Sequence, residues 1–213
     1  MPQRRIVPDR SIHHITNRGN DRKTIFPHLV DYGSFLVLLR EARERFEVHL
    51  YAYCLMPNHF HLLVWAADLA ALSAYMHYVQ REHACDLRSC DRSKGHGHIF
   101  QRRYWNDVVE GDGHLLNVMR YIEANPLRAG LVRAPEQWEW GSLWDRETGE
   151  RDLLHPSPIS LPADWKTIVG VPQERIDLDA IRRPIRMGRP AAKIYVSRKS
   201  QAGSLIMGEG SPP

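Results

Sequence analysis

Several features that would place this chain in a specialised class are scarce or missing from its 213 residues. Cysteine occurs only three times, an odd number that argues against a disulfide framework. No run approaches the roughly 20 apolar residues of a membrane-spanning helix. The opening residues, Met-Pro-Gln-Arg-Arg-Ile-Val-Pro, lack the apolar core of a signal peptide. The sequence therefore predicts a cytoplasmic protein with reduced thiols and no membrane partner.

Two of the cysteines could still belong to a metal site. Cys85 and Cys90, followed by His96 and His98, carry zinc-binding side chains within a short stretch. Their spacing fits no usual zinc module, and the glycines around the two histidines favour a flexible entry into the next strand. A zinc-binding protein is therefore kept as an alternative that metal analysis would reveal.

Acidic residues are missing from residues 181–200, which hold seven Lys or Arg, while residues 1–24 hold six basic and two acidic residues. The net charge is only +4, so the clustering says more than the total. Clustered cations release counterions when they meet phosphates, which favours a nucleic acid over a small anionic metabolite as partner. The alternative for each run is a solvated, disordered tail. Met187-Gly188-Arg189-Pro190 also resembles the Gly-Arg-Pro element of minor-groove hooks. In this basic tail, which we expect to lie apart from the main domain's functional site, the predicted DNA contacts are Arg182, Arg183, Arg186 and Arg189.

The most informative positive feature is His59-Phe60-His61, within the apolar run from Tyr53 to Trp65. Side chains two residues apart on a strand share a face, so the two imidazoles project together while Phe60 points to the core. Such a pair could hold a metal ion, or could be two incidental histidines satisfied by hydrogen bonds.

A second feature lies in the segment from Met119 to Val132. Helical spacing of apolar residues, a cap at Asp112 and the proline at 126 predict a helix over residues 113–124. Tyr121 and Asn125 are one turn apart on it, on one stripe. A tyrosine and a carboxamide aimed at two histidines would place a nucleophile beside a metal.

The coarse pattern predicts strands at residues 11–18, 48–56, 59–66 and 100–109, with helices at 30–46, 69–86 and 113–124. This βαββαβ order followed by a helix predicts an α+β fold, ferredoxin-like or RRM-like, with an antiparallel sheet and helices on one face. Residues 1–146 are predicted to form the catalytic domain. Residues 147–213 are predicted to be a linker and a partly disordered basic tail.

Four stretches, in this order, resemble the REP-associated tyrosine transposases of the HUH single-tyrosine superfamily. They are His13 to Asn20, Tyr53 to Trp65, Phe100 to Trp105 and Tyr121 to Val132, and the resemblance spans roughly residues 10–145. It implies the same fold, with the tyrosine helix lying across the open face of the sheet. It also implies that His59 and His61 bind a divalent metal, that Tyr121 is the nucleophile, and that Asn125 stands where a third ligand is expected.

The function that the resemblance implies is cleavage and transfer of single-stranded DNA at a hairpin-bearing repeat, through a 5′-phosphotyrosine. The cofactor would be Mg²⁺ or Mn²⁺, and the protein a monomer or a homodimer. Residues expected to hold the DNA in the main domain are Arg18, Gln101, Arg102, Arg103 and Tyr104. The alternative is an RRM-like nucleic-acid-binding module without catalytic activity.

Overall fold

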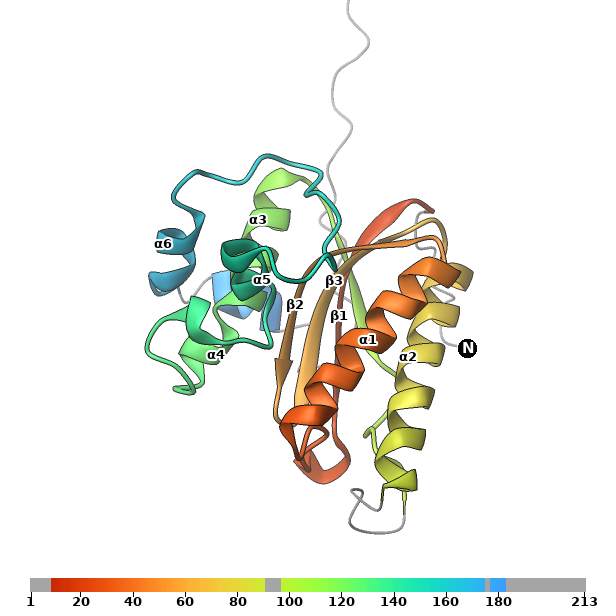
Figure 1. The fold of residues 1–213 in the computed structure, drawn as a ribbon. Coiled ribbons are helices and arrows are strands. Elements are labelled where there is room, and N and C mark those ends of the chain that lie inside the picture. The colour runs from red at the N-terminus through yellow and green to blue at the C-terminus, as the bar shows by residue number, and fades with distance from the viewer. Residues whose placement is uncertain (1–8, 91–96, 175–176, 183–213) are drawn as a thin grey trace, which may run out of the picture.

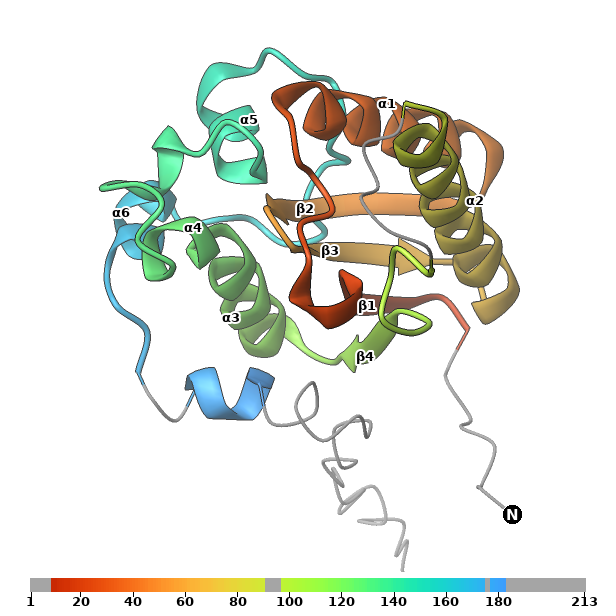
Figure 2. The same cartoon turned by 90° about the horizontal axis from the view of Figure 1, so that it is seen from below.

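The computed structural model describes residues 9–90, 97–174 and 177–182. Its centre is an antiparallel sheet of four strands in the order β2-β3-β1-β4, as a ferredoxin-like fold requires. Figures 1 and 2 show this sheet between two layers of helices. The strands are β1 (Ser11–Arg18), β2 (Val48–Met56), β3 (His59–Ala66) and β4 (Trp105–Val109).

Two long helices cover one face of the sheet, and the helix that carries Tyr121 lies on the other (Figure 1). The covering helices are α1 (Leu29–Arg45) and α2 (Leu69–Ser89), and the tyrosine helix is α3 (Asp112–Glu123). This is the predicted fold class. Smaller helices follow, with bounds α4 (Asn125–Arg128), α5 (Ser142–Thr148), α6 (Trp165–Gly170) and a last helical turn at residues 177–182.

The alternation of the strands separates two hydrophobic cores. Phe60, Leu62 and Val64 of β3 point toward α1 and α2 and are fully buried there, as the sequence predicted. Leu63 points the other way, into the core beneath α3. The same alternation leaves His59 and His61 on the α3 side of the sheet, because they share the face of Leu63.

The prediction of a strand over residues 100–109 was wrong in its first half. Strand β4 begins only at Trp105, while Phe100 makes one isolated bridge to Gly19 and residues 101–103 form bends. A short 3-10 turn at residues 20–22 follows β1 directly. The backbone N–H of Asn20 donates to the carbonyl of Ile99. Residues 100–103 are therefore a loop attached to the end of β1.

Residues beyond 146 pack against the domain as far as they are described. The boundary proposed at residue 146 falls inside α5, and Leu153, in the predicted linker, is buried in the core with α1. Trp165, Val169 and Ile181 are buried in the second core, beneath α3. Arg183, Arg186 and Arg189 lie outside the described residues. Over the described ranges, no helix has the length and apolar character needed to cross a membrane.

Candidate active site

His59 and His61 lie together on the α3 side of β3, at the start of the strand directly after the β2–β3 turn. Their ring centroids are 5.1 Å apart, with the rings nearly perpendicular. His61 is buried, whereas His59 is half-buried and its Nδ1–H donates a hydrogen bond of 2.7 Å to Oδ1 of Asn58. The predicted pair is thus formed, with one ring inside the protein and one near its surface.

A third imidazole, that of His14 on β1, joins the pair. Its Nε2 lies 3.0 Å from Nδ1 of His61, and the two rings are stacked with centroids 5.2 Å apart. His14 is 2% exposed. The sequence interpretation noted its stretch but gave it no role. The signal was present, because alternation along residues 11–18 places His14 on the face where a pairing partner of β1 would present His61.

Tyr121 of α3 stands over these rings. Its ring centroid lies 5.5 Å from that of His61 and 5.9 Å from that of His14, in both cases edge to face. The tyrosine is 5% exposed. The structure therefore brings together the predicted tyrosine and the predicted histidine pair, from elements about 60 residues apart in the sequence.

Two arginines flank the Tyr121 ring. Cζ of Arg128, in α4, lies 4.3 Å from the ring centroid, and Cζ of Arg182 lies 5.9 Å from it. Burial lowers the pKa of Arg128 to about 10, so it remains charged at neutral pH. Arg182 was predicted to belong to a tail separate from the site, and that was wrong. Ile181 is buried beneath α3 and holds its neighbour against the tyrosine.

Asn125 follows the end of α3 rather than continuing it. The helix ends at Glu123, and Asn125 begins the short helix α4. Its Nδ2 donates to the carbonyl of Tyr121 at 3.1 Å, and the residue is 8% exposed. The carboxamide thus stays beside Tyr121, one turn away as predicted. Because the side-chain nitrogen of Asn125 is bonded to the backbone of α3, the side-chain oxygen is the atom left for another partner.

Burial keeps the three site imidazoles neutral at physiological pH. It lowers the pKa of His59 to about 4 and that of His14 to about 3. Burial is also the main cause that lowers the pKa of His61, helped by the neighbouring His59 and His14. A metal ion binds neutral imidazole, so the protonation state suits a divalent cation.

The donor set also fits such a cation. Nδ1 of His59 and of His61 is held by a protein partner, so Nε2 of each ring is the nitrogen left for a metal. In the described part of the chain no group of three or more His, Cys, Asp or Glu side chains could hold a metal. A site on the two histidines would therefore need a donor of another kind, and the carboxamide oxygen of Asn125 is one.

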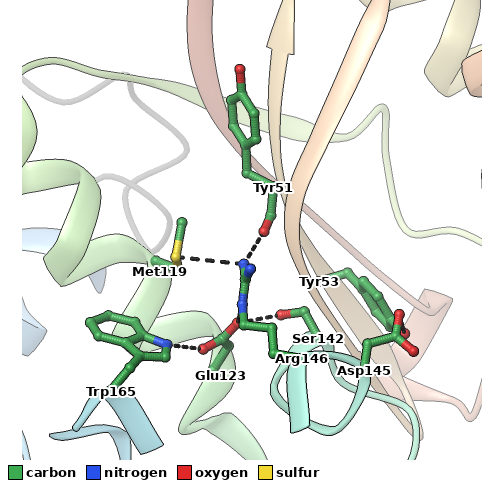
Figure 3. A network of polar contacts seen from close by, with 8 residues as sticks. All are labelled: Tyr51, Tyr53, Met119, Glu123, Ser142, Asp145, Arg146 and Trp165. Atoms are coloured by element: carbon green, nitrogen blue, oxygen red, sulfur yellow. Dashed lines mark hydrogen bonds and ion pairs between the residues drawn. The ribbon is translucent and has the colours of Figure 1, made fainter. Parts of the chain in front are cut away.

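A buried carboxylate in the last turn of α3 holds this helix in place (Figure 3). Glu123, 2% exposed, accepts hydrogen bonds from Ser142 at 2.6 Å, Arg146 at 3.0 Å and Trp165 at 2.6 Å. Arg146 also donates to the carbonyl of Tyr51 in β2. These contacts connect α3 to the sheet, to α5 and to α6. The sequence analysis missed Glu123, since a single acid near a helix end has no distinguishing pattern.

The predicted DNA-binding residues of the main domain divide into two groups. Arg18 is exposed and pairs directly across the ladder with His59, so it shares the face of the histidines. Gln101, Arg102 and Arg103 are exposed in the loop beside it, where the backbone nitrogen of Gln101 donates to the carbonyl of Arg18 at 2.9 Å. Tyr104 instead packs against the core with α1 and α2, where burial raises its pKa.

The loop forms one wall of an open depression of about 470 Å³. Its other wall is the end of α2. The lining includes no acidic residue and consists of Ala84, Arg88, His98, Ile99, Phe100, Gln101, Arg102 and Arg103. A hollow lined by three arginines together with Phe100 is a surface suited to a polyanion.

A comparison with protein families matches residues 9–125 to the family described as Transposase IS200 like. The chain belongs to that family. It is accordingly a DNA transesterification enzyme, and the family generally depends on a divalent metal. The matched range contains both histidines, Tyr121 and Asn125, so the resemblance expected from the sequence is confirmed.

The chain is also similar to individual proteins. A protein of Haemophilus influenzae described as a REP-associated tyrosine transposase is 28% identical, over 54% of this chain and 71% of its own. A solved REP-associated tyrosine transposase bound to a REP hairpin has a TM-score of 0.57 and 15% identity, covering 76% of this chain and 95% of that one. A crystal structure of a transposase from Deinococcus radiodurans has a TM-score of 0.41 and 17% identity, covering 58% and 96%. The solved REP-associated tyrosine transposase, with its TM-score of 0.57, supports the fold.

Proposed function

We propose that this IS200-like transposase cleaves and transfers single-stranded DNA at a hairpin, with Tyr121 as its nucleophile. The phenolic oxygen attacks a backbone phosphorus and the bond to the 3′-oxygen breaks. This leaves a 5′-phosphotyrosine and a free 3′-hydroxyl, and the proton lost by the phenol balances the one gained by the 3′-oxygen. The phosphodiester energy is kept, so strands can be rejoined without a nucleotide cofactor.

The observation that carries this proposal is the position of the Tyr121 ring, 5.5 Å from the ring of His61 on the open face of the sheet. Of the seven tyrosines within the described residues, it is the one whose ring is set against His61, and it lies on the predicted helical stripe. Arg128 beside it adds positive charge where the attacked phosphate gains negative charge.

His59, His61 and the carboxamide of Asn125 are proposed to hold one divalent ion. Mg²⁺ and Mn²⁺ both accept such a set of nitrogen and oxygen donors. A bound ion would act as a Lewis acid on the scissile phosphate and favour the phenolate form of a tyrosine whose ordinary pKa is near 10. The burial of His61 excludes water from one side of the site.

The DNA is proposed to run from the histidine face around the end of β1 into the arginine-lined depression. Arg18 stands opposite His59, and the loop with Arg102 and Arg103 is bonded to the backbone of Arg18. A flexible single strand can make this bend more readily than a duplex. A hairpin next to that strand is supported by the relatives, which are described as REP-associated. The tail residues Arg183, Arg186 and Arg189 are proposed to contact the hairpin.

Covalent capture of DNA tests the proposal directly. The full chain is incubated with labelled single-stranded oligonucleotides that carry a hairpin, drawn from the DNA flanking its own gene, with Mg²⁺ or Mn²⁺. Denaturing electrophoresis should show a protein-DNA conjugate with the wild type and with Tyr104→Phe, and none with Tyr121→Phe. The last variant should still bind the hairpin, because only the attacking oxygen is removed.

Two results would go against it. A conjugate with Tyr121→Phe would move the nucleophile elsewhere. Hairpin binding by the wild type with no conjugate under any metal would favour the non-catalytic RRM-like module instead.

A further inference from the structure

We propose that His14 is a positioning residue that fixes the ring of His61 for metal binding, an inference that rests on the proposed metal site at His59 and His61. The proposed site of His59, His61, Tyr121 and Asn125 gives this histidine no role. It touches neither DNA nor metal in the proposed arrangement, and acts through the two side chains that do.

The contacts of His14 point to this role. Its Nε2 is 3.0 Å from Nδ1 of His61, and their rings stack at 5.2 Å. Its ring also meets the edge of Tyr121 at 5.9 Å and that of Trp105 at 5.8 Å. A side chain that is 2% exposed and packed on three rings has little freedom to turn. His61 is therefore held in one orientation by a partner that is itself fixed.

The hydrogen bond also selects a tautomer. For Nε2 of His61 to offer its lone pair to a cation, the ring proton must reside on Nδ1. That proton is then donated to Nε2 of His14, which must be the unprotonated nitrogen of its own ring. Ring nitrogens that face away from a bound metal almost always have such a partner, and losing it typically costs about 10- to 100-fold in metal affinity.

His13, the next residue, provides a matched control. It is equally buried, at 1% exposure, but alternation turns it to the α1 and α2 side of the sheet. Its ring bonds to Ser11 at 2.9 Å and to Asn106 at 3.5 Å. A change there disturbs the same strand and the same kind of side chain without reaching His61.

The experiment measures Mn²⁺ binding to the full chain by calorimetry, without DNA. His14→Phe keeps a ring of similar shape but removes the nitrogen, and should weaken Mn²⁺ binding about 10- to 100-fold. His14→Gln, whose carboxamide oxygen can accept the same proton, should recover much of that loss. His13→Phe should bind Mn²⁺ like the wild type. With hairpin DNA, His14→Phe should need more Mn²⁺ for half-maximal conjugate formation but approach the wild-type rate at saturation.

Circular dichroism identifies the folded variants. A folded His14→Phe that binds Mn²⁺ like the wild type overturns the proposal, as does an equal loss in a folded His13→Phe. If His14→Phe does not fold, nitrogen-detected spectra of the wild-type histidine rings with Mg²⁺ decide. A proton on Nε2 of His14 overturns the proposal, and a proton on Nδ1 supports it. Mn²⁺ binding that survives His61→Ala would instead refute the metal site of the proposed function.

Discussion

The guanidinium of Arg128 lies across the face of Tyr121, with Cζ 4.3 Å from the ring centroid, while its Nη2 donates to the carbonyl of the same tyrosine at 2.5 Å. That carbonyl also accepts from Asn125. A residue seven positions later thus fixes both the ring and the backbone of Tyr121. Arg128 reaches both from α4, the short helix that begins two residues after α3 ends.

Replacing Arg128 should therefore slow the chemistry more than it weakens DNA binding. Arg128→Lys keeps the charge but cannot stack a planar group on the ring while bonding to the carbonyl. A desolvated cation-aromatic contact contributes roughly 2 kcal/mol, so we expect conjugate formation to slow about 10- to 30-fold. Single-turnover rates on a labelled hairpin measure this. Arg133→Lys, at an exposed position nearby, is the control and should react normally.

Glu123→Gln should destabilise the protein by roughly 3 kcal/mol. The substitution leaves Arg146, whose side chain is 17% exposed, without its buried counter-charge. Removing one partner of a buried ion pair typically costs about 3–5 kcal/mol. Urea unfolding monitored by tryptophan fluorescence gives the difference. A loss below about 1 kcal/mol would show that the contacts in Figure 3 contribute little to holding α3.

The elements with clear periodicity could be predicted from the sequence. β1, β2 and β3 begin and end at the predicted residues, and the tyrosine helix is correct to within a residue at each end. The histidine pair was found because two residues on one strand face need only alternation. Their meeting with Tyr121 depends on how a helix crosses a sheet, and the family resemblance supplied that expectation.

Other features have no local signal. Residues 100–104 contain aromatic and basic side chains that suit a strand, but the edge of β1 bonds to them only at isolated points. These residues lack the alternation of a strand, because Arg102 and Arg103 are both exposed while Tyr104 packs inward. The position of Arg182 over Tyr121 likewise depends on the tertiary packing of Ile181. The pattern of a short basic segment does not predict that Ile181 is buried.

The protein should lose stability in mild acid, in part through His13. Burial lowers the pKa of His13 to about 4, whereas in the unfolded chain it is near 6.5. Between these values the unfolded chain binds the extra proton, so the free energy of unfolding falls as pH drops from about 6.5 to about 4 and is level above that range. One such histidine contributes up to about 1.4 kcal/mol per pH unit.

Urea unfolding at pH 7, 6 and 5, without metal, measures the slope. His13→Gln removes one titrating group and should make the dependence shallower by about one proton. Equal slopes for the wild type and His13→Gln would mean that folding does not shift the pKa of His13.

The arginine-lined depression should bind the single-stranded part of the substrate. Replacing Arg102 and Arg103 together with alanine removes two exposed cations, so the slope of log affinity against log salt should fall by about one to two units. The effect should be larger on an oligonucleotide with a single-stranded flank than on a blunt hairpin. Arg40→Ala, on the exposed surface of α1, is the control. An equal loss on both oligonucleotides would place the two arginines on the hairpin instead.

Two truncations should separate the packed part of the C-terminal region from its basic tail. A cut after Leu161 would spare the site if the region beyond it were only a linker and a separate basic tail, as expected from the sequence. The structure changes that expectation, because this cut removes Trp165, Val169 and Ile181 from the core beneath α3. Burial of each such side chain contributes roughly 1.5–3 kcal/mol, so the loss is a large part of an ordinary domain's stability. That variant should unfold or form no conjugate.

A cut after Arg182 should behave differently. It keeps Ile181 in the core and Arg182 beside Tyr121, but removes the remaining basic residues of the tail. We expect normal thermal unfolding and normal conjugate formation at saturating DNA, with weaker hairpin binding. Arg189→Ala in the full chain should lower affinity on every hairpin sequence and reduce the salt slope by about one unit if this residue contacts only phosphate. Hairpin affinity that is unchanged by the cut after Arg182 would show that the tail does not bind DNA, and would leave recognition to Arg18 and the loop at residues 101–103.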